Sequence, residues 1–127
     1  MPKTNLKVFL VEDDPTLVEM YRVKFTESGF DLTVSGNGSE GLEIALKQPF
    51  DIILLDIILP GMDGFAILQE LKKNAKTKAT PVVMMSNLGQ EADISRGKEL
   101  GANDYLVKAS FTPSQVVEKI LSIVGKP

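Results

Sequence analysis

The sequence predicts an α/β fold in which one doubly wound sheet of five parallel strands carries helices on both faces. Four short apolar runs without polar alternation recur along the chain, which is typical of strands buried on both faces, and residues 32–34 form a weaker fifth strand. A segment with helical spacing follows each run, so that every crossover has a helix to cover the sheet. The five runs are residues 8–11, 32–34, 52–55, 82–85 and 105–107.

The first two helices have clear boundaries in the sequence. Asp14 is a good N-cap with Pro15 at the first helical position, and Gly29 is expected to end the first helix. The apolar residues at helical spacing between them are Leu17, Tyr21 and Phe25. A second helix is predicted over residues 39–47, with Leu42, Ala45 and Leu46 on its buried face.

The third helix is expected to begin after Asp63, an N-cap that closes a Pro- and Gly-containing loop. Its inner face is formed by Phe65, Leu68 and Leu71. Lys72 and Lys73 lie near its C-terminal end, where we expect them to be solvated and without a role.

The last two helices differ in how much they can bury. The fourth, over residues 90–100, has only Ile94 and Leu100 as large apolar residues, which predicts low local stability. The fifth begins with Thr112, Pro113 and Gln115, a capping box with Pro at the first helical position, and is expected to reach almost to Pro127.

Composition predicts a single domain over residues 1–127. The chain has 43% hydrophobic and 24% charged residues, which is ordinary for a soluble globular protein. Its net charge of −3 gives no electrostatic reason to expect nucleic-acid binding. No apolar stretch is long enough to span a membrane, and the N-terminal residues do not resemble a signal peptide, so a cytoplasmic location is expected.

Two residue types are absent from the chain. The sequence has no Cys, which excludes disulfides, thiolate nucleophiles and cysteine zinc sites. It also has no His, which excludes Ser-His-Asp hydrolysis and imidazole acid–base chemistry. If a phosphohistidine takes part in the function, another protein must supply it.

Polar residues follow four of the five predicted strands at the point where each strand ends. They are Glu12 and Asp13, then Asp56, then Ser86, then Lys108. In a parallel sheet these strand ends meet at one edge, where open α/β folds bind ligands. Three carboxylates, a hydroxyl and an ammonium at one edge predict a metal-dependent site that accepts a phosphoryl group.

Nucleotide-binding folds do not fit this pattern. A dinucleotide-binding turn needs glycines after the first strand, so that a pyrophosphate can approach the helix N-terminus. Here the turn is Glu12-Asp13-Asp14-Pro15, which repels phosphate unless a cation intervenes, and there is no glycine–lysine phosphate loop.

With these residues in order, the chain resembles the receiver domain of two-component response regulators, in particular the chemotaxis-regulator type, over essentially its whole length. The matching motifs are Glu12-Asp13, Asp56, the loop 59–64 (Leu-Pro-Gly-Met-Asp-Gly), Ser86 and Lys108. The resemblance implies a flavodoxin-like three-layer sandwich with strand order 2-1-3-4-5 and five helices.

The resemblance also implies a Mg²⁺ site. Asp13 and Asp56 would be direct ligands, Glu12 would act largely through water, and the backbone carbonyl of Ile58 would complete the set. Mg²⁺ suits such a site because it takes carboxylate oxygens, retains waters and binds substrate phosphate.

The remaining site residues take roles in phosphoryl transfer. Asp56 is expected to be the nucleophile that becomes an acyl phosphate, while the Lys108 ammonium stabilises the transferred charge. By resemblance, Ser86 senses the phosphoryl group and Tyr105 reorients in response. The implied partners are a sensor histidine kinase or phosphotransfer protein and a downstream protein that the sequence does not identify.

Two classes of function remain open from the sequence. The first is a phosphorylation-switched interaction module that catalyses only its own phosphorylation and dephosphorylation, as a monomer or a phosphorylation-dependent dimer. A regulator that stands alone, without an output domain, is the favoured form of it. The second is a metal-dependent phosphatase with an aspartyl nucleophile, but no His or second carboxylate is suitably placed after Asp56 to assist turnover.

Three departures from the receiver pattern involve residues beside the site. Lys108 is followed by Ala109 in place of the usual cis Pro, and we expect a trans bond because a cis bond without Pro costs about 3 kcal/mol. The following loop is expected to adjust so that Lys108 remains directed at Asp56. Ser86 replaces the equally common Thr, and Asn87 replaces a smaller residue, so that it narrows access or adds a polar contact.

The positions two after Asp56 and two after Ser86 are apolar. They are Ile58 and Leu88, which by resemblance flank the path of the hydrolytic water. Because neither side chain can hold or orient water, we expect slow loss of the phosphoryl group.

Overall fold

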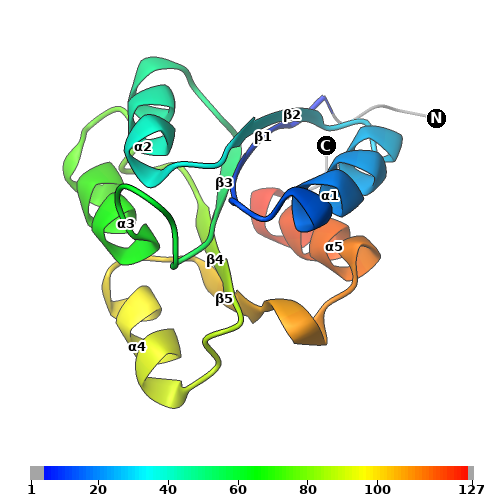
Figure 1. Cartoon of the computed structure of the whole chain (residues 1–127). Helices are drawn as coiled ribbons and strands as arrows, with labels where there is room; N and C mark the ends of the chain where they lie inside the picture. The colour runs from blue at the N-terminus through cyan, green and yellow to red at the C-terminus, as the bar shows by residue number, and fades with distance from the viewer. Residues whose placement is uncertain (1–4, 126–127) are drawn as a thin grey trace.

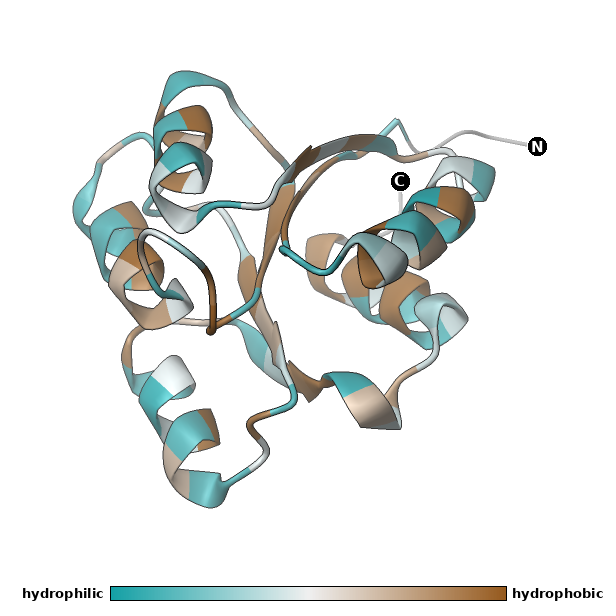
Figure 2. Ribbon diagram, viewed as in Figure 1, coloured by the Kyte–Doolittle hydropathy of each residue, from teal (hydrophilic) through white to brown (hydrophobic). Residues whose placement is uncertain are grey.

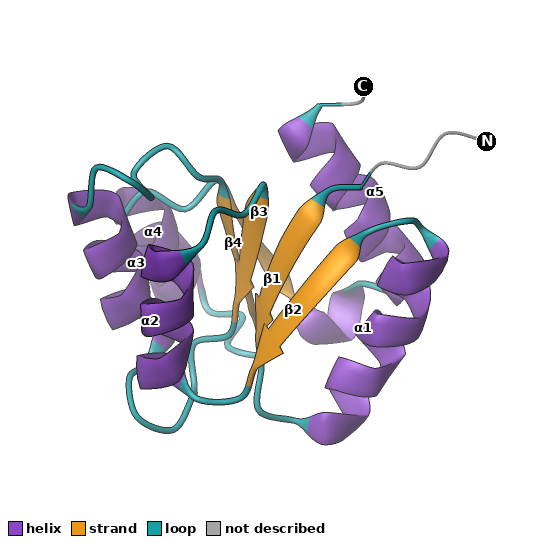
Figure 3. Ribbon diagram, turned by 90° about the horizontal axis from the view of Figure 1, so that it is seen from above, coloured by secondary structure: helices purple, strands orange, loops and turns teal. Residues whose placement is uncertain are grey.

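A computed structural model describes residues 5–125 as a sheet with helices on both faces (Figures 1 and 3). The strands are β1 (Lys7–Val11), β2 (Asp31–Ser35), β3 (Ile52–Leu55), β4 (Val82–Ser86) and β5 (Asp104–Val107). The helices are α1 (Pro15–Glu27), α2 (Gly38–Lys47), α3 (Gly64–Lys73), α4 (Glu91–Glu99), α5 (Pro113–Val124) and the short 3₁₀ helix η1 (Lys108–Ser110).

The strands are all parallel and lie in the order β2-β1-β3-β4-β5. This order and the five α-helices confirm the predicted fold. The last paired residues place Val11 beside Leu55 and Ser86 beside Val107. The residues that follow these positions therefore lie at one edge of the sheet.

Two apolar cores cover the two faces of the sheet. Helices α1 and α5 lie on one face, and α2, α3 and α4 lie on the other (Figure 1). Alternate residues of β1 enter different cores: Val8 and Leu10 pack under α1 and α5, while Phe9 and Val11 face α2 and α3. Figure 2 shows the same division, with hydrophobic strands and helix faces turned inward. Burial on both faces explains why the strand runs lack polar alternation.

The predicted starts of α1, α3 and α5 are confirmed by their caps. The Asp14 carboxylate accepts hydrogen bonds from the N–H groups of Thr16 and Leu17, and Thr112 forms the capping box with Gln115. Helix α2 begins one residue earlier than predicted, at Gly38, because the Asn37 side chain caps it. Helix α5 ends at Val124; the predicted end near Pro127 lies outside the described residues.

Helix α4 buries the least of the five α-helices. Gly97 is its only buried residue, whereas α3 buries Phe65, Leu68 and Leu71 among others. The expectation of a weakly packed fourth helix is confirmed in its burial. Low buried area makes this helix the one that moves at the lowest free-energy cost.

Lys72 has a structural role that the sequence analysis did not predict. Its ammonium donates hydrogen bonds to the carbonyl oxygens of Lys78 and Thr80, at 3.2 and 3.0 Å. Burial lowers the pKa of this ammonium. Lys72 thus holds the connection between α3 and β4 against the end of α3. Lys73 is exposed, as expected. Along residues 5–125, no helix is long and apolar enough to cross a membrane.

Candidate functional site

The residues predicted to form the site meet at the carboxyl edge of the sheet. Glu12 and Asp13 follow β1, Asp56 follows β3, Ser86 ends β4 and Lys108 follows β5. Backbone hydrogen bonds continue the sheet to this edge, since the Asp56 N–H donates to the Val11 carbonyl at 3.0 Å. Each side chain is therefore positioned by a buried strand.

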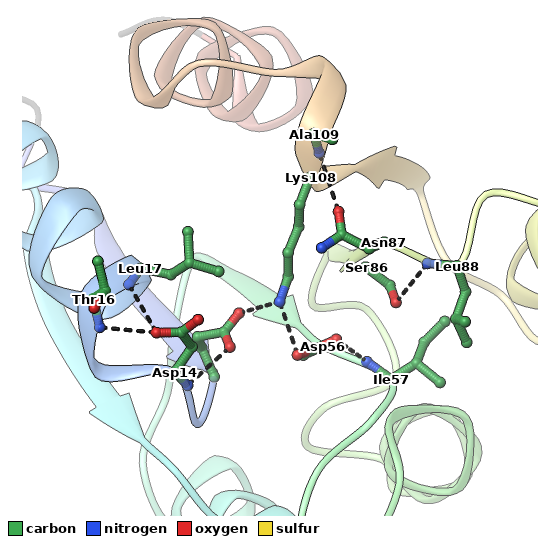
Figure 4. A network of polar contacts seen from close by, with 11 residues as sticks. Asp14, Thr16, Leu17, Asp56, Ile57, Ser86, Asn87, Leu88, Lys108 and Ala109 are labelled. Carbon is green, nitrogen blue, oxygen red and sulfur yellow. Dashed lines mark hydrogen bonds and ion pairs between the residues drawn. The ribbon is translucent and has the colours of Figure 1, made fainter.

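The Lys108 ammonium joins two of the three carboxylates (Figure 4). Its Nζ lies 2.5 Å from Glu12 Oε1 and 2.8 Å from Asp56 Oδ2. The exposed side-chain fractions of Lys108, Glu12 and Asp56 are 8%, 2% and 9%, so these ion pairs lie in a weakly solvated environment. The contact with Asp56 was predicted, but the closer one with Glu12 was not.

Burial and pairing act in opposite directions on these charges. Burial alone lowers the pKa of Lys108, but its hydrogen bonds to Asp56 and Glu12 outweigh burial and leave the pKa above its ordinary value. Burial raises the pKa of Glu12 above its ordinary value, against the opposing effect of the Lys108 hydrogen bond. The ammonium consequently stays charged at neutral pH and offsets part of the acidic charge.

The three carboxylates are arranged so that they can hold a divalent cation. One oxygen each from Glu12, Asp13 and Asp56 lies within 4.8 Å of the others. Asp13 is exposed, whereas Glu12 and Asp56 are buried, so a cation can approach from the solvent side. Oxygen donors of this kind suit Mg²⁺. The Glu12 carboxylate is further held by the Asp14 N–H at 3.1 Å.

The loop after β3 folds tightly around Asp56. The Asp56 Oδ1 atom accepts the Ile57 N–H at 2.7 Å, and the Ile57 carbonyl accepts the Gly64 N–H at 2.8 Å. A Cβ atom at Gly64 would lie 2.1 Å from the Asp56 carbonyl oxygen, so only glycine fits there. Gly61 has a φ of +86°, which also favours glycine. These constraints explain the glycines of the loop 59–64.

The loop after β4 is tied to β5 by Tyr105. The Tyr105 hydroxyl donates a hydrogen bond to the Leu88 carbonyl, while Ser86 Oγ accepts the Leu88 N–H at 3.2 Å. The Tyr105 side chain lies inward, and the residue is only 7% exposed. Its ring packs beside Gly97, where an added Cβ would lie 3.2 Å from Cδ2. The absence of a side chain at Gly97 leaves room for this inward position.

A cavity of about 180 Å³ opens beside Asp56. Its lining residues are Asp56, Ile58, Ser86, Asn87, Leu88 and Lys108. Ile58 is 65% exposed, and Leu88 faces it from the loop after β4. A larger cavity of about 240 Å³ near Phe50 and Thr77 contains no acidic residue and none of the predicted site residues.

Asn87, after β4, makes a polar contact, which was one of the two expectations for it, but the sequence did not predict its partner. Asn87 Oδ1 accepts a hydrogen bond from the Ala109 N–H at 3.2 Å. The predicted trans bond between Lys108 and Ala109 is confirmed, and the chain then enters η1. A Pro at position 109 would disfavour helical backbone at Lys108 and would remove the N–H group. The absence of Pro at position 109 and the presence of Asn87 are therefore linked, because the Asn87 side chain accepts a hydrogen bond from an N–H group that Pro would lack.

A scan of protein families identifies residues 8–121 as a response regulator receiver domain. The transcriptional activator protein PfeR of Pseudomonas aeruginosa is 50% identical over 102 residues, which cover 80% of this chain and 32% of PfeR. Protein PilH of the same species is 36% identical, with 80% of this chain and 84% of PilH covered. The chain spans about half the length of several other transcriptional regulators that it matches.

Solved structures agree with this assignment. The chemotaxis response regulator CheY4 of Vibrio cholerae matches with a TM-score of 0.86 and 29% sequence identity. The match covers 96% of this chain and 100% of CheY4. The order of the five parallel strands and the arrangement of the five helices are therefore those of a response regulator of known structure.

Proposed function

This chain belongs to the family of response regulator receiver domains, and we propose that Asp56 is the residue that accepts the phosphoryl group. The observation that carries this proposal is the Lys108 ammonium 2.8 Å from Asp56 Oδ2, in a cavity beside a cluster of carboxylates. Lys108 and the Ile57 N–H hold one Asp56 oxygen each, so the carboxylate is oriented before any donor arrives.

Charge neutralisation explains the need for a metal ion. Glu12, Asp13 and Asp56 contribute three negative charges, and Lys108 contributes one positive charge. A bound Mg²⁺ supplies the other two positive charges and lowers the repulsion of the anionic donor. Asp13 and Asp56 are the proposed direct ligands, with Glu12 acting through water and the Ile58 carbonyl completing the set.

The donor we propose, from the membership of the receiver-domain family, is a phosphohistidine on a sensor histidine kinase or phosphotransfer protein. This chain contains no His, so another protein must carry the phosphohistidine. An Asp56 oxygen attacks phosphorus, the phosphorus–nitrogen bond breaks, and the imidazole of the donor leaves. Lys108 then neutralises a phosphoryl oxygen, and the Ser86 hydroxyl donates to another. The acyl phosphate alters the loop after β4.

We place the switch at Ser86 and Tyr105. Ser86 Oγ and the Tyr105 hydroxyl both contact Leu88, so a movement of Ser86 toward a phosphoryl oxygen changes the segment to which Tyr105 is bonded. The next element, α4, is the least buried helix and can respond at low cost. The surface formed by α4 and β5 is therefore the proposed output surface.

The domain is a signalling module and not an enzyme that turns over an external substrate. We propose that it catalyses only its own phosphorylation and dephosphorylation. A phosphatase would need a free general acid or base. Among the described residues that line the cavity, Asp56 and Lys108 are the only ionisable ones, and the two are paired with each other. We further propose a single domain over residues 1–127, a cytoplasmic location and a protein target. The net charge of −3 does not favour direct nucleic-acid binding by this chain.

Incubation with acetyl phosphate and Mg²⁺, followed by intact mass measurement, tests the proposal. The expected result is a gain of one phosphoryl group that is lost in Asp56→Asn and retained in Asp14→Asn. Asp14 is a suitable control because it caps α1 outside the cluster. A gain of mass in Asp56→Asn that equals that of the unaltered chain would contradict the assignment.

A further inference from the structure

Asn87 lines the cavity beside Asp56, and its carboxamide has one end fixed and one end free. The Oδ1 atom accepts the Ala109 N–H at 3.2 Å, and an N–H donor requires an oxygen at that position. The Nδ2 group must therefore point the other way. Figure 4 shows it turned to the side on which Lys108 and Asp56 lie.

The Nδ2 group has no protein acceptor among the described residues, although Asn87 lies among groups that would surround a phosphoryl group. Asp56, Ser86 and Lys108 line the same cavity of about 180 Å³. Asn87 is exposed, so water can satisfy its two N–H donors until an anionic group replaces the water. A hydrogen bond to a charged oxygen is stronger than one to water or to a neutral group.

We propose that Asn87 is a further phosphoryl-binding residue, which donates a hydrogen bond from Nδ2 to an oxygen of the group on Asp56. This inference rests on the proposed role of Asp56. The Ala109 N–H orients the carboxamide, so that little side-chain freedom is lost when the phosphoryl oxygen binds. Asn87 adds a neutral donor to the Ser86 hydroxyl and the Lys108 ammonium.

The same contact links two loops that would both face the phosphoryl group. Ser86 pairs with Val107 at the end of the β4–β5 ladder, and the Asn87 side chain extends this pairing to Ala109. A phosphoryl oxygen bound to Nδ2 would pull on a side chain that is already bonded to the segment carrying Lys108. The two loops would then close on the group together.

Beryllofluoride with Mg²⁺, which forms a phosphoryl-like complex with an aspartate, is a suitable probe. Its affinity would be measured by calorimetry for the unaltered chain, Asn87→Ala, Asn87→Asp and Asp56→Asn. Asn87→Asp retains an acceptor for the Ala109 N–H but removes the donor, whereas Asn87→Ala removes both. We expect about tenfold weaker binding in Asn87→Ala and a larger loss in Asn87→Asp.

A second measurement separates donation from a structural effect. Mg²⁺ affinity without beryllofluoride should stay within about twofold of the unaltered chain in Asn87→Ala, because Asn87 is not among the clustered carboxylates. Equal beryllofluoride affinity in the unaltered chain and both Asn87 variants would overturn the inference. Loss in Asn87→Ala with normal binding in Asn87→Asp would assign Asn87 only to the orientation of Ala109 and would also overturn it. Failure of the unaltered chain to bind beryllofluoride would instead contradict the role of Asp56.

Discussion

The two edges of the sheet each use a lysine in a different way. At the carboxyl edge, the Lys108 ammonium contacts the carboxylates of Glu12 and Asp56. At the opposite edge, the Lys72 ammonium donates hydrogen bonds to the carbonyl oxygens of Lys78 and Thr80, and within residues 5–125 it has no carboxylate partner. Both ammonium groups are partly removed from water, but only Lys108 has partners of opposite charge.

Because of this difference in partners, the pKa values of the two lysines shift in opposite directions. Burial lowers the pKa of Lys72, since carbonyl oxygens do not compensate for lost solvation of the ammonium. The carboxylates outweigh burial at Lys108 and raise its pKa. A lysine among carboxylates remains a cation available to an incoming phosphoryl group, while a lysine among carbonyls serves the chain connection.

The largest effect on stability and phosphorylation is expected from Lys108→Met, which leaves the Glu12 and Asp56 carboxylates without the ammonium that pairs with them. We expect a loss of about 3 kcal/mol in the free energy of unfolding without Mg²⁺, because a buried charge loses its partner. The raised pKa means that Lys108 contributes this stability fully below pH 10.5 and loses it as the pH rises above that value. Phosphorylation by acetyl phosphate should fall at least tenfold.

Urea unfolding with and without Mg²⁺ would measure the stability change. Millimolar Mg²⁺ should restore part of the lost stability in Lys108→Met, since the cation replaces some of the missing positive charge. The proposed electrostatic role would be wrong if Lys108→Met were as stable as the unaltered chain at neutral pH.

The second-largest effect is expected on the stability that the folded chain gains from Mg²⁺ binding. A cation that binds only the folded chain should add about 1.4 kcal/mol when present at ten times its Kd. Asp13→Asn should remove most of this gain, because Asp13 is the exposed member of the acidic cluster. A melting temperature that does not respond to millimolar Mg²⁺, in the unaltered chain and in Asp13→Asn alike, would contradict the metal site.

Lys72→Met should have a smaller effect that Mg²⁺ does not change. The substitution retains the aliphatic stem beside Gly101 but removes two hydrogen bonds to carbonyl oxygens, which predicts a loss of about 1 kcal/mol. Lys73→Met is the matched control, since the ion pair of Lys73 with Glu70 is exposed and contributes little to stability. Equal stability of the two variants would remove the structural distinction between these lysines.

The smallest effect is expected on the lifetime of the phosphorylated form. Ile58 and Leu88 line the cavity beside Asp56, and neither can orient a water molecule. Ile58→Asn combined with Leu88→Glu should speed dephosphorylation a few-fold, which would be followed by the loss of phosphoryl mass over time. An equal or slower rate in the double variant would show that these side chains do not shield the phosphorus.

Local sequence patterns were sufficient to predict most of the fold. Strand burial, the Asp14 and Thr112 caps and the weak burial of α4 all follow from residues close together in the chain. The sequence analysis started helix α2 one residue too late and did not predict η1, because neither start depends on a hydrophobic pattern. Backbone hydrogen bonding at such positions is decided by neighbouring loops, as at Gly38, whose N–H donates to the Pro60 carbonyl.

The sequence by itself determined which groups meet at the site. Parallel strands bring their carboxyl ends to one edge, so the residues after each apolar run converge whatever their side-chain details. Only the tertiary structure decided which atoms become partners. Lys108 and Asp56 are 52 positions apart, and Asn87 and Ala109 are 22 apart, so no local pattern sets these distances. Packing positions each backbone segment to a fraction of an ångström, and three contacts depend on it. They are the short distance between Lys108 and Glu12, the Asn87–Ala109 hydrogen bond, and the hydrogen bonds from Lys72 to the connection between α3 and β4.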